Sequence, residues 1–555
     1  MPPLNPQAHL PTHDVLNMPP HLGDQDLWAE DIALQEAVTQ NGAGWTADHL
    51  SRFGRHMGQA EMLHHSELAN KHAPELKTFD RYGMRVDQVE FHPAYHTLME
   101  AAIRNEVHSF AWNHEGAGAH VANGALQYMY QQIEGGVMCS MAMTYSALPS
   151  LHSTPGIAEE WIPRLLSTTY DPRDIPVEQK LGATMGMFMT EKQGGSDVRA
   201  NSTRAVPAGI AEGVGQEYRI TGHKFFSSAP MCDAFLVLAY SDGGLSCFLV
   251  PRWRPDGTRN GMYLQRLKDK LGNKSNASSE VEFVDAYGVM LGAEGRGVRT
   301  IIDMVQHNRY YCMTSSAGMM RQGLRQAMHH VRHRSAFKRK LVDQPLMRNV
   351  LADLAIETEA AMAYSLRLGR AIDEAGDDEM AAGLARIGTA IGKYWVCKRA
   401  PAHVGESLEC LGGAGYVEES GLPRIYREAP LNGIWEGSGN VICLDVWRAL
   451  QREEAAVPAI LAELEAAKGG NALLDRTAAL VKEDLGDPED FELRARAVTE
   501  RLAVALQAAL LVQHAPPAVA DAFCETRLGD RWHGAYGTLP KGTDFDTIID
   551  RIVPS

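Results

Sequence analysis

The chain has 555 residues, of which 45% are hydrophobic and 22% are charged, a composition typical of soluble globular proteins. Its length predicts two to four domains. The formal net charge of −16 argues against a general attraction to nucleic acid or anionic membranes, and no apolar run approaches the roughly 20 residues that span a bilayer.

The N-terminus is expected to be an extended arm. Residues 1 to about 23 are rich in Pro, His and Asn, and they lack the basic and apolar regions of a secretory signal. Such an arm is expected to be ordered only where it docks on a partner. The eight cysteines are scattered and contain no Cys-x-x-Cys pair, which indicates reduced core thiols in a cytoplasmic protein.

Periodicity along the chain predicts helices, then a β-region, then helices again. In the first 180 or so residues, apolar positions recur at helical spacing, as in 27–39, 46–68 and 91–105. From about 182 to 292, short apolar or alternating runs are separated by Gly- and Pro-containing turns. Helical spacing returns after residue 292 and continues through 460–467 and 494–512. This order predicts an α+β fold with segregated helical and β domains.

Two segments of the β-region carry groups suited to a flat ligand. Met189–Asp197 exposes hydroxyls and backbone N–H groups in a tight loop that could bond a heteroaromatic edge or a pyrophosphate. A plain turn between strands is the alternative. Phe226-Ser227-Ser228 could wall a flat ring and bond its polar rim, and the alternative is a β-core followed by a turn.

The helical region that follows contains two segments with groups for a phosphate. Arg334, followed by Phe337 and Gln344, lies in a connection between helices, and arginine suits bidentate phosphate contact, although a surface arginine is the alternative. Glu409, Gly412 and Gly413 close a helix. These glycines either simply end the helix or let a phosphate or an adenine approach the backbone.

A pair of histidines in the same region has metal-ligand spacing. His329 and His333 are four residues apart on a predicted helix, beside several arginines and lysines. No third ligand and no His-Glu-x-x-His motif is evident, so a solvated or interface surface is favoured and no metal site is predicted.

The stretch Trp435-Glu436-Gly437-Ser438-Gly439-Asn440 places a carboxylate between an aromatic residue and a small, flexible turn. A glutamate there can project into a pocket while the adjacent backbone packs against a planar ligand. That arrangement suits a base that removes a proton from carbon beside a bound cofactor. The alternative is a helix start, with Ser438 or Asn440 capping the apolar run that follows.

In order and approximate spacing, these five segments resemble the acyl-CoA dehydrogenase family across about residues 80–450. The resemblance implies an N-terminal helical domain, a central β-barrel-like domain and a C-terminal helical bundle, with FAD as the cofactor. It implies that Glu436 is the catalytic base, that Arg309 lies near the substrate entrance, and that Trp435 and Gly437 adjoin the substrate. It also implies FAD contacts, some to a neighbouring subunit, for Met189, Thr190, Gly195, Ser196, Phe226, Ser227, Ser228, Arg334, Phe337, Gln344, Glu409, Gly412, Gly413, Ser438 and Asn440.

The chain departs from the family pattern at several positions. Lys192 replaces the usual proline after Thr-Glu, and Lys338 replaces the glycine after Phe337. The spacing from Arg334 to Gln344 is one residue short. Trp435 replaces the usual tyrosine before the base, and its larger ring would narrow the pocket, which favours a short or branched acyl chain.

Three long strings, at 189–198, 266–278 and 434–440, resemble the branch of the family linked to the alkylation response. That branch adds a fourth, helical domain, assembles as a tetramer and binds double-stranded DNA. The resemblance implies an arm (1–40), an N-terminal helical domain (41–181), a central β-domain (182–292), a helical bundle (293–450) and an extra helical domain (451–555).

Charge in the extra domain bears on the DNA prediction. Residues 451–555 hold 11 Lys and Arg against 18 Asp and Glu, a formal charge of −7. Non-specific DNA binding depends on clustered cations that displace counterions, so an acidic domain must present one basic face to bind duplex DNA. The cations concerned include Arg494, Arg496, Arg501, Arg527 and Arg531.

Three hypotheses follow for the activity. The first is FAD-dependent α,β-dehydrogenation of an acyl-CoA, with electrons passing to an electron-transfer flavoprotein or to oxygen. The second is a DNA-binding, protective flavoprotein with only residual dehydrogenase activity. The third is a flavin oxidase or monooxygenase on the same fold, because a fold alone does not fix the chemistry.

Overall fold

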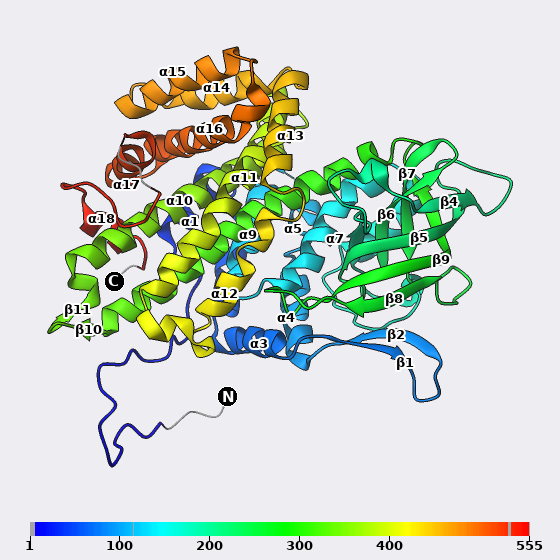
Figure 1. Ribbon diagram of the computed structural model, residues 1–555, viewed down its shortest axis with the longest axis horizontal. Helices are drawn as coiled ribbons and strands as arrows, with labels where there is room; N and C mark the ends of the chain where they lie inside the picture. Colours follow the sequence, from blue (N-terminus) through cyan, green and yellow to red (C-terminus); the bar gives the residue numbers. More distant parts are fainter. Residues whose placement is uncertain (1–5, 115, 531–533, 554–555) are drawn as a thin grey trace. The chain divides into compact units, whose positions relative to one another are not determined.

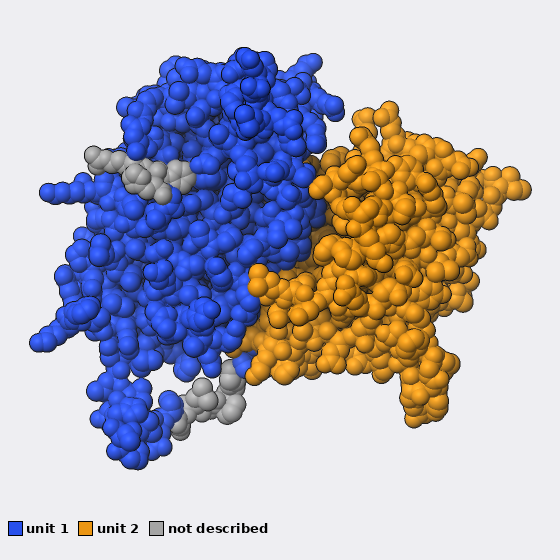
Figure 2. All heavy atoms as spheres, viewed as in Figure 1, with its two compact units in different colours: residues 1–64, 116–133, 312–555 blue, residues 65–115, 134–311 orange. Residues whose placement is uncertain are grey.

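The computed structural model describes residues 6–114, 116–530 and 534–553. It divides into two compact units, shown in different colours in Figure 2. Unit 1 contains residues 1–64, 116–133 and 312–555, and unit 2 contains residues 65–115 and 134–311. Two helices, α3 (Ala60–Lys71) and α9 (Gly297–His333), include residues of both units.

Unit 2 contains a closed barrel of five strands, as the predicted β-region requires (Figure 1). Around the ring, β6 pairs with β4, β4 with β5, β5 with β9, β9 with β7, and β7 again with β6. Closure leaves the ring without an open edge. β3 extends the sheet beside β6, and β8 extends it beside β9. The strands are β3 (Met185–Phe188), β4 (Arg204–Pro207), β5 (Glu217–Ser228), β6 (Ala234–Ser241), β7 (Gly244–Pro251), β8 (Met262–Leu267) and β9 (Ser278–Leu291).

Burial along the strands explains why this region folds as a barrel. The run from Ala234 to Ala239 in β6 is completely buried, and its partner β7 is buried from Leu245 to Pro251. Continuous apolar runs of this kind belong to strands covered on both faces. Four helices of unit 2 accompany the barrel: α4 (Pro93–Arg104), α5 (Phe110–Asn113), α7 (Gly136–His152) and α8 (Pro155–Leu165).

One hairpin interrupts the region expected to be helical. β1 (Glu75–Phe79) pairs with β2 (Arg85–Glu90) in antiparallel register. The turn between them is closed by Asp80, whose carboxylate accepts hydrogen bonds from the N–H groups of Tyr82 and Met84. An Asp that bonds the backbone of the following residues favours a turn over a continuing helix.

The described residues of unit 1 are mainly helical, with an extended N-terminal arm and one very short hairpin. α10 packs against α6 and α11, and α16 packs against α10, α13 and α15. The hairpin consists of β10 (Ser335–Ala336) and β11 (Arg339–Lys340). The helices are α1 (Ile32–Gln40), α2 (Ala47–Met57), α6 (Ala119–Gln131), α10 (Pro345–Glu374), α11 (Glu379–Glu409), α12 (Leu422–Glu428), α13 (Gly439–Arg452), α14 (Ala456–Ala466), α15 (Ala472–Gly486), α16 (Phe491–His514), α17 (Pro517–Phe523) and α18 (Phe545–Asp550).

Several predicted elements are shorter or longer than the pattern indicated. α1 begins at Ile32, inside the segment assigned to the arm, because the Asp31 carboxylate caps the helix by accepting from the Leu34 N–H. The segment predicted as one helix over 46–68 breaks at Gly58 into α2 and α3. Within the described residues, no helix combines the length and apolar character needed to cross a membrane. All eight cysteines lie in that part of the chain; they are buried, and no disulfide joins them.

Candidate active site

The loop after β3 is held in place by one buried carboxylate, that of Glu191. Its Oε1 accepts hydrogen bonds from the Thr203 hydroxyl at 2.6 Å and the Lys224 ammonium at 2.9 Å. Its Oε2 accepts from the N–H and hydroxyl of Ser202 at 2.6 and 2.8 Å. Burial alone would raise the pKa of Glu191, but Lys224 and these hydrogen bonds hold that pKa well below its usual range. An ionised Glu191 therefore fixes both ends of the loop.

The loop is also joined to the strand that carries the Phe-Ser-Ser segment. The Thr190 carbonyl accepts a hydrogen bond from the Phe225 N–H at 2.8 Å. A Cβ added at Gly195 would stand 2.5 Å from the Thr190 hydroxyl, so only glycine lets the turn fold back this closely. The structure thus brings together the two predicted flavin-contacting segments of unit 2, with Met189 and Thr190 half-buried and Gly195 and Ser196 exposed.

Not all side chains of the second segment face the same way. The Phe226 ring is 52% exposed and Ser228 is partly exposed, whereas Ser227 is fully buried. The Ser227 carbonyl accepts a hydrogen bond from the Ser279 hydroxyl at 3.0 Å. Phe226 and Ser228 can therefore offer side chains to a flat ligand, whereas the Ser227 side chain is covered.

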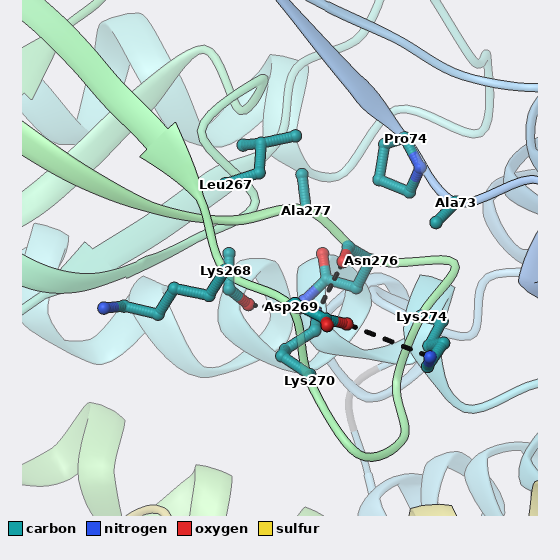
Figure 3. Close-up of a pocket in the computed structure, with 10 residues that line it drawn as sticks. Ala73, Pro74, Leu267, Lys268, Asp269, Lys270, Lys274, Asn276 and Ala277 are labelled. Carbon is teal, nitrogen blue, oxygen red and sulfur yellow. Dashed lines mark hydrogen bonds and ion pairs between the residues drawn. The ribbon is translucent and has the colours of Figure 1, made fainter.

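A cavity of about 250 Å³ adjoins the same strand (Figure 3). The Ser278 hydroxyl in its wall lies 3.3 Å from the Ser228 hydroxyl, and the Lys268 ammonium stands 3.5 Å from the centre of the Phe225 ring. The cavity is basic, but Lys268 bonds Glu280 at 2.8 Å and Lys270 donates to the Asn276 carbonyl at 2.6 Å. Its lining comprises Ala73, Pro74, Leu267, Lys268, Asp269, Lys270, Lys274, Asn276, Ala277 and Ser278.

Replacing Glu191 by glutamine is expected to destabilise unit 2 by about 2 kcal/mol, because Lys224 stays buried while its charged acceptor becomes a neutral amide. The midpoint of urea unfolding measures this loss. The same substitution in a Lys224→Met background is expected to cost less, since no buried ammonium then needs a counter-charge. Equal losses in the two backgrounds would contradict the assigned role of the pair.

In unit 1, the segment around Glu436 is a strained turn at the start of α13. Glu436 adopts a φ of +57° and Gly437 a φ of +107°, both in the left-handed region. A left-handed non-glycine residue is uncommon and occurs both in tight turns and at functional sites. Ser438 stands at the N-cap position of α13, but its side chain makes no capping bond within the part of the chain that the structure describes. The helix-cap alternative therefore explains the position of Ser438 and not the conformation of Glu436.

Buried polar side chains anchor this turn. The Trp435 indole N–H donates to the Asn432 side-chain oxygen at 2.9 Å, and Asn432 in turn donates to the Ser315 hydroxyl at 2.7 Å. The ammonium of Lys393, which is only 1% exposed, donates to the Gly437 carbonyl. The loop is thus tied to α9 and α11 on both sides of Glu436.

The Glu436 carboxylate acts electrostatically on a buried thiol of α9. Burial raises the pKa of Cys312 well above its usual value, and Cys397 and the Glu436 carboxylate act in the same direction. Glu436 is itself only partly buried. The carboxylate therefore sits at the edge of an apolar helical core, where a base can reach a substrate and is partly shielded from water.

The remaining predicted residues of unit 1 lie on three surface segments. Arg334 is partly exposed, and Gln344 donates from its amide to the Ala336 carbonyl at 3.1 Å. Glu409 is the last residue of α11 and is exposed. A Cβ added at Gly412 or Gly413 would meet no atom of the described residues within 4 Å, so the backbone there is open to an approaching group. Asn440 is exposed in the first turn of α13.

Arg309 lies in unit 2, on α9, and only 6% of its surface is exposed. One of its guanidinium nitrogens donates to the Gln306 side-chain oxygen at 3.0 Å. The histidine pair on the same helix bonds backbone: His333 donates from Nδ1 to the His329 carbonyl at 2.8 Å, and His329 donates from Nε2 to the Pro20 carbonyl at 2.8 Å.

Three of the five arginines named for DNA binding pair with acidic neighbours. Arg494 and Arg501 both pair with Asp484, and Arg527 is buried against Asp353 and Glu357. Arg531 lies outside the described residues, and the Arg496 guanidinium stands 5.9 Å from the centre of the Tyr394 ring. DNA binding by residues 451–555 stays a prediction, and retardation of duplex DNA in a gel over a range of salt concentrations is its test.

Sequence reasoning missed Glu191, Lys224 and Lys393 as supports of the site. Glu191 lies inside the flavin motif, so a carboxylate within a loop rich in Ser and Thr was an available signal. Lys224 and Lys393 were visible only as lysines within apolar stretches of a strand and a helix.

Family models match most of the chain. The adaptive response protein AidB N-terminal domain matches residues 17–172, the acyl-CoA dehydrogenase middle domain matches 186–286, and the acyl-CoA dehydrogenase C-terminal domain matches 295–451. The chain is 45% identical to AidB of Escherichia coli (strain K12) over 525 residues, which is 94% of this chain and 96% of AidB.

Solved structures agree with the fold. Caenorhabditis elegans ACDH-11 in complex with C11-CoA superposes with a TM-score of 0.85 at 27% identity, over 96% of each chain. An acyl-CoA dehydrogenase from Bacillus anthracis, complexed with FAD, superposes with a TM-score of 0.62 at 18% identity. That alignment covers 79% of this chain and 82% of the Bacillus protein.

Proposed function

The chain belongs to the acyl-CoA dehydrogenase family, in its AidB-like branch, and we propose that it removes the α and β hydrogens of a short or branched acyl-CoA with Glu436 as the base. It is an FAD-dependent oxidoreductase of that family. The observation that carries the assignment of the base is the left-handed Glu436 at the start of α13, braced by Trp435 and Lys393.

The groups on unit 2 fit the cofactor. The turn after Thr190 offers exposed glycine backbone, and beside it stand the half-exposed Phe226 ring and the Ser228 hydroxyl. An aromatic face with adjacent N–H and O–H groups suits a flat heteroaromatic ring with a polar edge. We assign Met189, Thr190, Gly195, Ser196, Phe226 and Ser228 to the flavin, and the backbone of Ser227 to its edge.

The groups on unit 1 fit the dinucleotide and the substrate. The open backbone at Gly412 and Gly413 and the guanidinium of Arg334 suit phosphate or adenine contact. We assign these, with Phe337, Gln344, Glu409, Ser438 and Asn440, to FAD, and Trp435 and Gly437 to the substrate. Arg309, which belongs to unit 2, is also assigned to the substrate. The assignments of Arg334, Phe337 and Gln344 concern the FAD of a neighbouring copy in a homotetramer.

The proposed chemistry rests on the carboxylate of Glu436. Its oxygen removes the α-proton of the thioester, while its own backbone N–H polarises the thioester carbonyl and so makes that proton more acidic. Bound FAD supplies the acceptor for the β-hydride. The Trp435 indole, held by its bond to Asn432, limits the room beside the base and so favours short or branched chains.

Electrons are proposed to leave to an electron-transfer flavoprotein or to oxygen. Buried thiols without a disulfide among the described residues favour a reducing compartment, so we propose a cytoplasmic location.

Anaerobic bleaching of the yellow flavin against a panel of acyl-CoAs tests the function. Butyryl-, isovaleryl- and undecanoyl-CoA form the panel, the last because ACDH-11 was solved with C11-CoA. We expect fast bleaching by the short or branched members. Bleaching by undecanoyl-CoA alone would overturn the chain-length preference and keep the dehydrogenase. Bleaching by none, in protein that holds FAD, would overturn the proposed reaction.

A further inference from the structure

The N-terminal arm docks on unit 1 of its own chain through Asn17. The Asn17 amide nitrogen donates to the Ser335 carbonyl at 2.8 Å, and the Ser335 N–H donates to the Asn17 side-chain oxygen at 2.7 Å. These two bonds satisfy the N–H and the carbonyl of Ser335, the first residue of β10, as a neighbouring strand would. The sequence predicts that the arm is ordered only where it docks on a partner. Here the surface on which it docks belongs to the same chain.

Further bonds reach the arm from α9 and from the residue after it. The Arg334 guanidinium donates to the Asn17 carbonyl at 2.8 Å, and the His329 ring donates to the Pro20 carbonyl at 2.8 Å. The same short piece of the arm is therefore bonded by three residues, namely His329, Arg334 and Ser335. The arm carbonyl therefore helps to orient the Arg334 guanidinium.

The hairpin that follows needs outside support. β10 and β11 have two residues each, and the connecting residues Phe337 and Lys338 have φ of +52° and +65°. Hairpin turns with two left-handed residues favour Asn and Gly, because other side chains are strained there. A two-stranded hairpin is marginal in water even when it is unstrained. Contacts such as those of Asn17 must therefore help to keep it formed.

The strained turn holds a large apolar side chain away from its own unit. Phe337 is 95% exposed, and the arm side chains next to Asn17 are also exposed, Leu16 at 73% and Met18 at 56%. Met18 adjoins the hairpin, because its sulfur lies 3.1 Å from the Arg334 guanidinium. The proposed occupant is a second copy of this chain, because Arg334 and Phe337 are assigned to the FAD of a neighbouring copy.

We propose that residues 17–20 form a strap that holds Arg334 and the hairpin in the conformation that contacts the FAD of a second copy. This inference rests on the proposed function, which assigns Arg334 and Phe337 to that cofactor. The strap binds no ligand itself. It raises the fraction of chains whose hairpin is formed, and the apparent affinity for FAD scales with that fraction.

Asn17→Gly removes the side-chain bonds of the strap and keeps its backbone conformation. Asn17 has a φ of +60°, which glycine adopts without strain, so the variant loses the side-chain bonds and gains no clash. We expect the full-length variant to bind FAD about fivefold more weakly in a fluorescence titration. Gln7→Gly, at an exposed arm position, is the matched control and is expected to bind as the parent does.

Hydrogen exchange gives a readout that does not depend on FAD. The Ser335 amide should exchange faster in Asn17→Gly than in the parent or in Gln7→Gly, because its acceptor has been removed. Parent-like exchange and parent-like FAD affinity would overturn the strap. Faster exchange with unchanged FAD affinity would confirm the contact between Asn17 and Ser335 and overturn its role in FAD binding. A parent protein that binds no FAD would overturn the proposed function, and exchange at Ser335 would still judge the contact.

Discussion

Glu436→Gln is expected to lower kcat for acyl-CoA dehydrogenation by about 10³-fold, in the middle of the range typical of lost general acid–base catalysis. Glutamine keeps the size of the side chain and, with it, the turn that the Trp435 and Lys393 bonds maintain. It removes the one function assigned to the carboxylate, which is to accept the α-proton. The loss should therefore fall on kcat, with a small effect on KM.

Rapid mixing with butyryl-CoA under anaerobic conditions measures this step directly as the rate of flavin bleaching. Absorbance of the purified variant first establishes that FAD is retained. Glu453→Gln, at an exposed position near the end of α13, is the matched control and should bleach at the parental rate. Glu436→Asp keeps a carboxylate on a shorter side chain and should fall between the two. A variant that holds FAD and bleaches at full rate would remove Glu436 from the mechanism.

The fold was predictable because its elements follow strong local patterns. The continuous apolar run of β6 and the helical spacing of α10 and α11 each specify one type of element. The hairpin β1–β2 was not predictable in the same way. No position of either strand is buried, and the strands lie between two helices with clear periodicity.

The candidate site likewise has parts that the sequence predicts and parts that it does not. The turn at Glu436 and the loop at Thr190 are local sequence features, and each was visible without the structure. Their supports are not local: Glu191 and Lys224 lie 33 residues apart, and Asn17 and Ser335 lie 318 apart. No spacing rule links such positions, because only the folded chain brings them together. The left-handed conformation of Glu436, a non-glycine residue, was equally invisible to sequence patterns.

A buried ion network joins the end of the chain to the helical bundle of unit 1. The Arg527 guanidinium pairs with Asp353 and with Glu357, both at 2.6 Å, and all three side chains are at most 2% exposed. Arg399 reaches the other oxygen of Glu357 at 3.2 Å. The backbone N–H of Gly537 donates to Asp353 at 2.9 Å, so this carboxylate also anchors the segment that follows. Two cations and two anions thus balance inside the bundle.

Arg527→Met is expected to destabilise unit 1 by about 3–5 kcal/mol at pH 7, since it leaves two buried carboxylates with one cation between them. Urea unfolding followed by circular dichroism measures the loss. Arg476→Met is the matched control, because Arg476 is 49% exposed beside Asp530, and its loss should stay below about 1 kcal/mol. Adding Glu357→Gln to Arg527→Met should recover part of the stability, because it removes the uncompensated charge.

The pH dependence separates this electrostatic loss from a simple packing defect. Burial would raise the pKa of Glu357, but Arg399 and Arg527 outweigh it and lower that pKa to about 2. A depressed carboxyl pKa stabilises the fold above the unfolded-state pKa, and that stabilisation is lost as pH falls toward 2. Without Arg527 the depression shrinks, so Glu357 protonates at higher pH and relieves the buried charge. The deficit of Arg527→Met should therefore be smaller at pH 4 than at pH 7. A packing defect would give the same deficit at both.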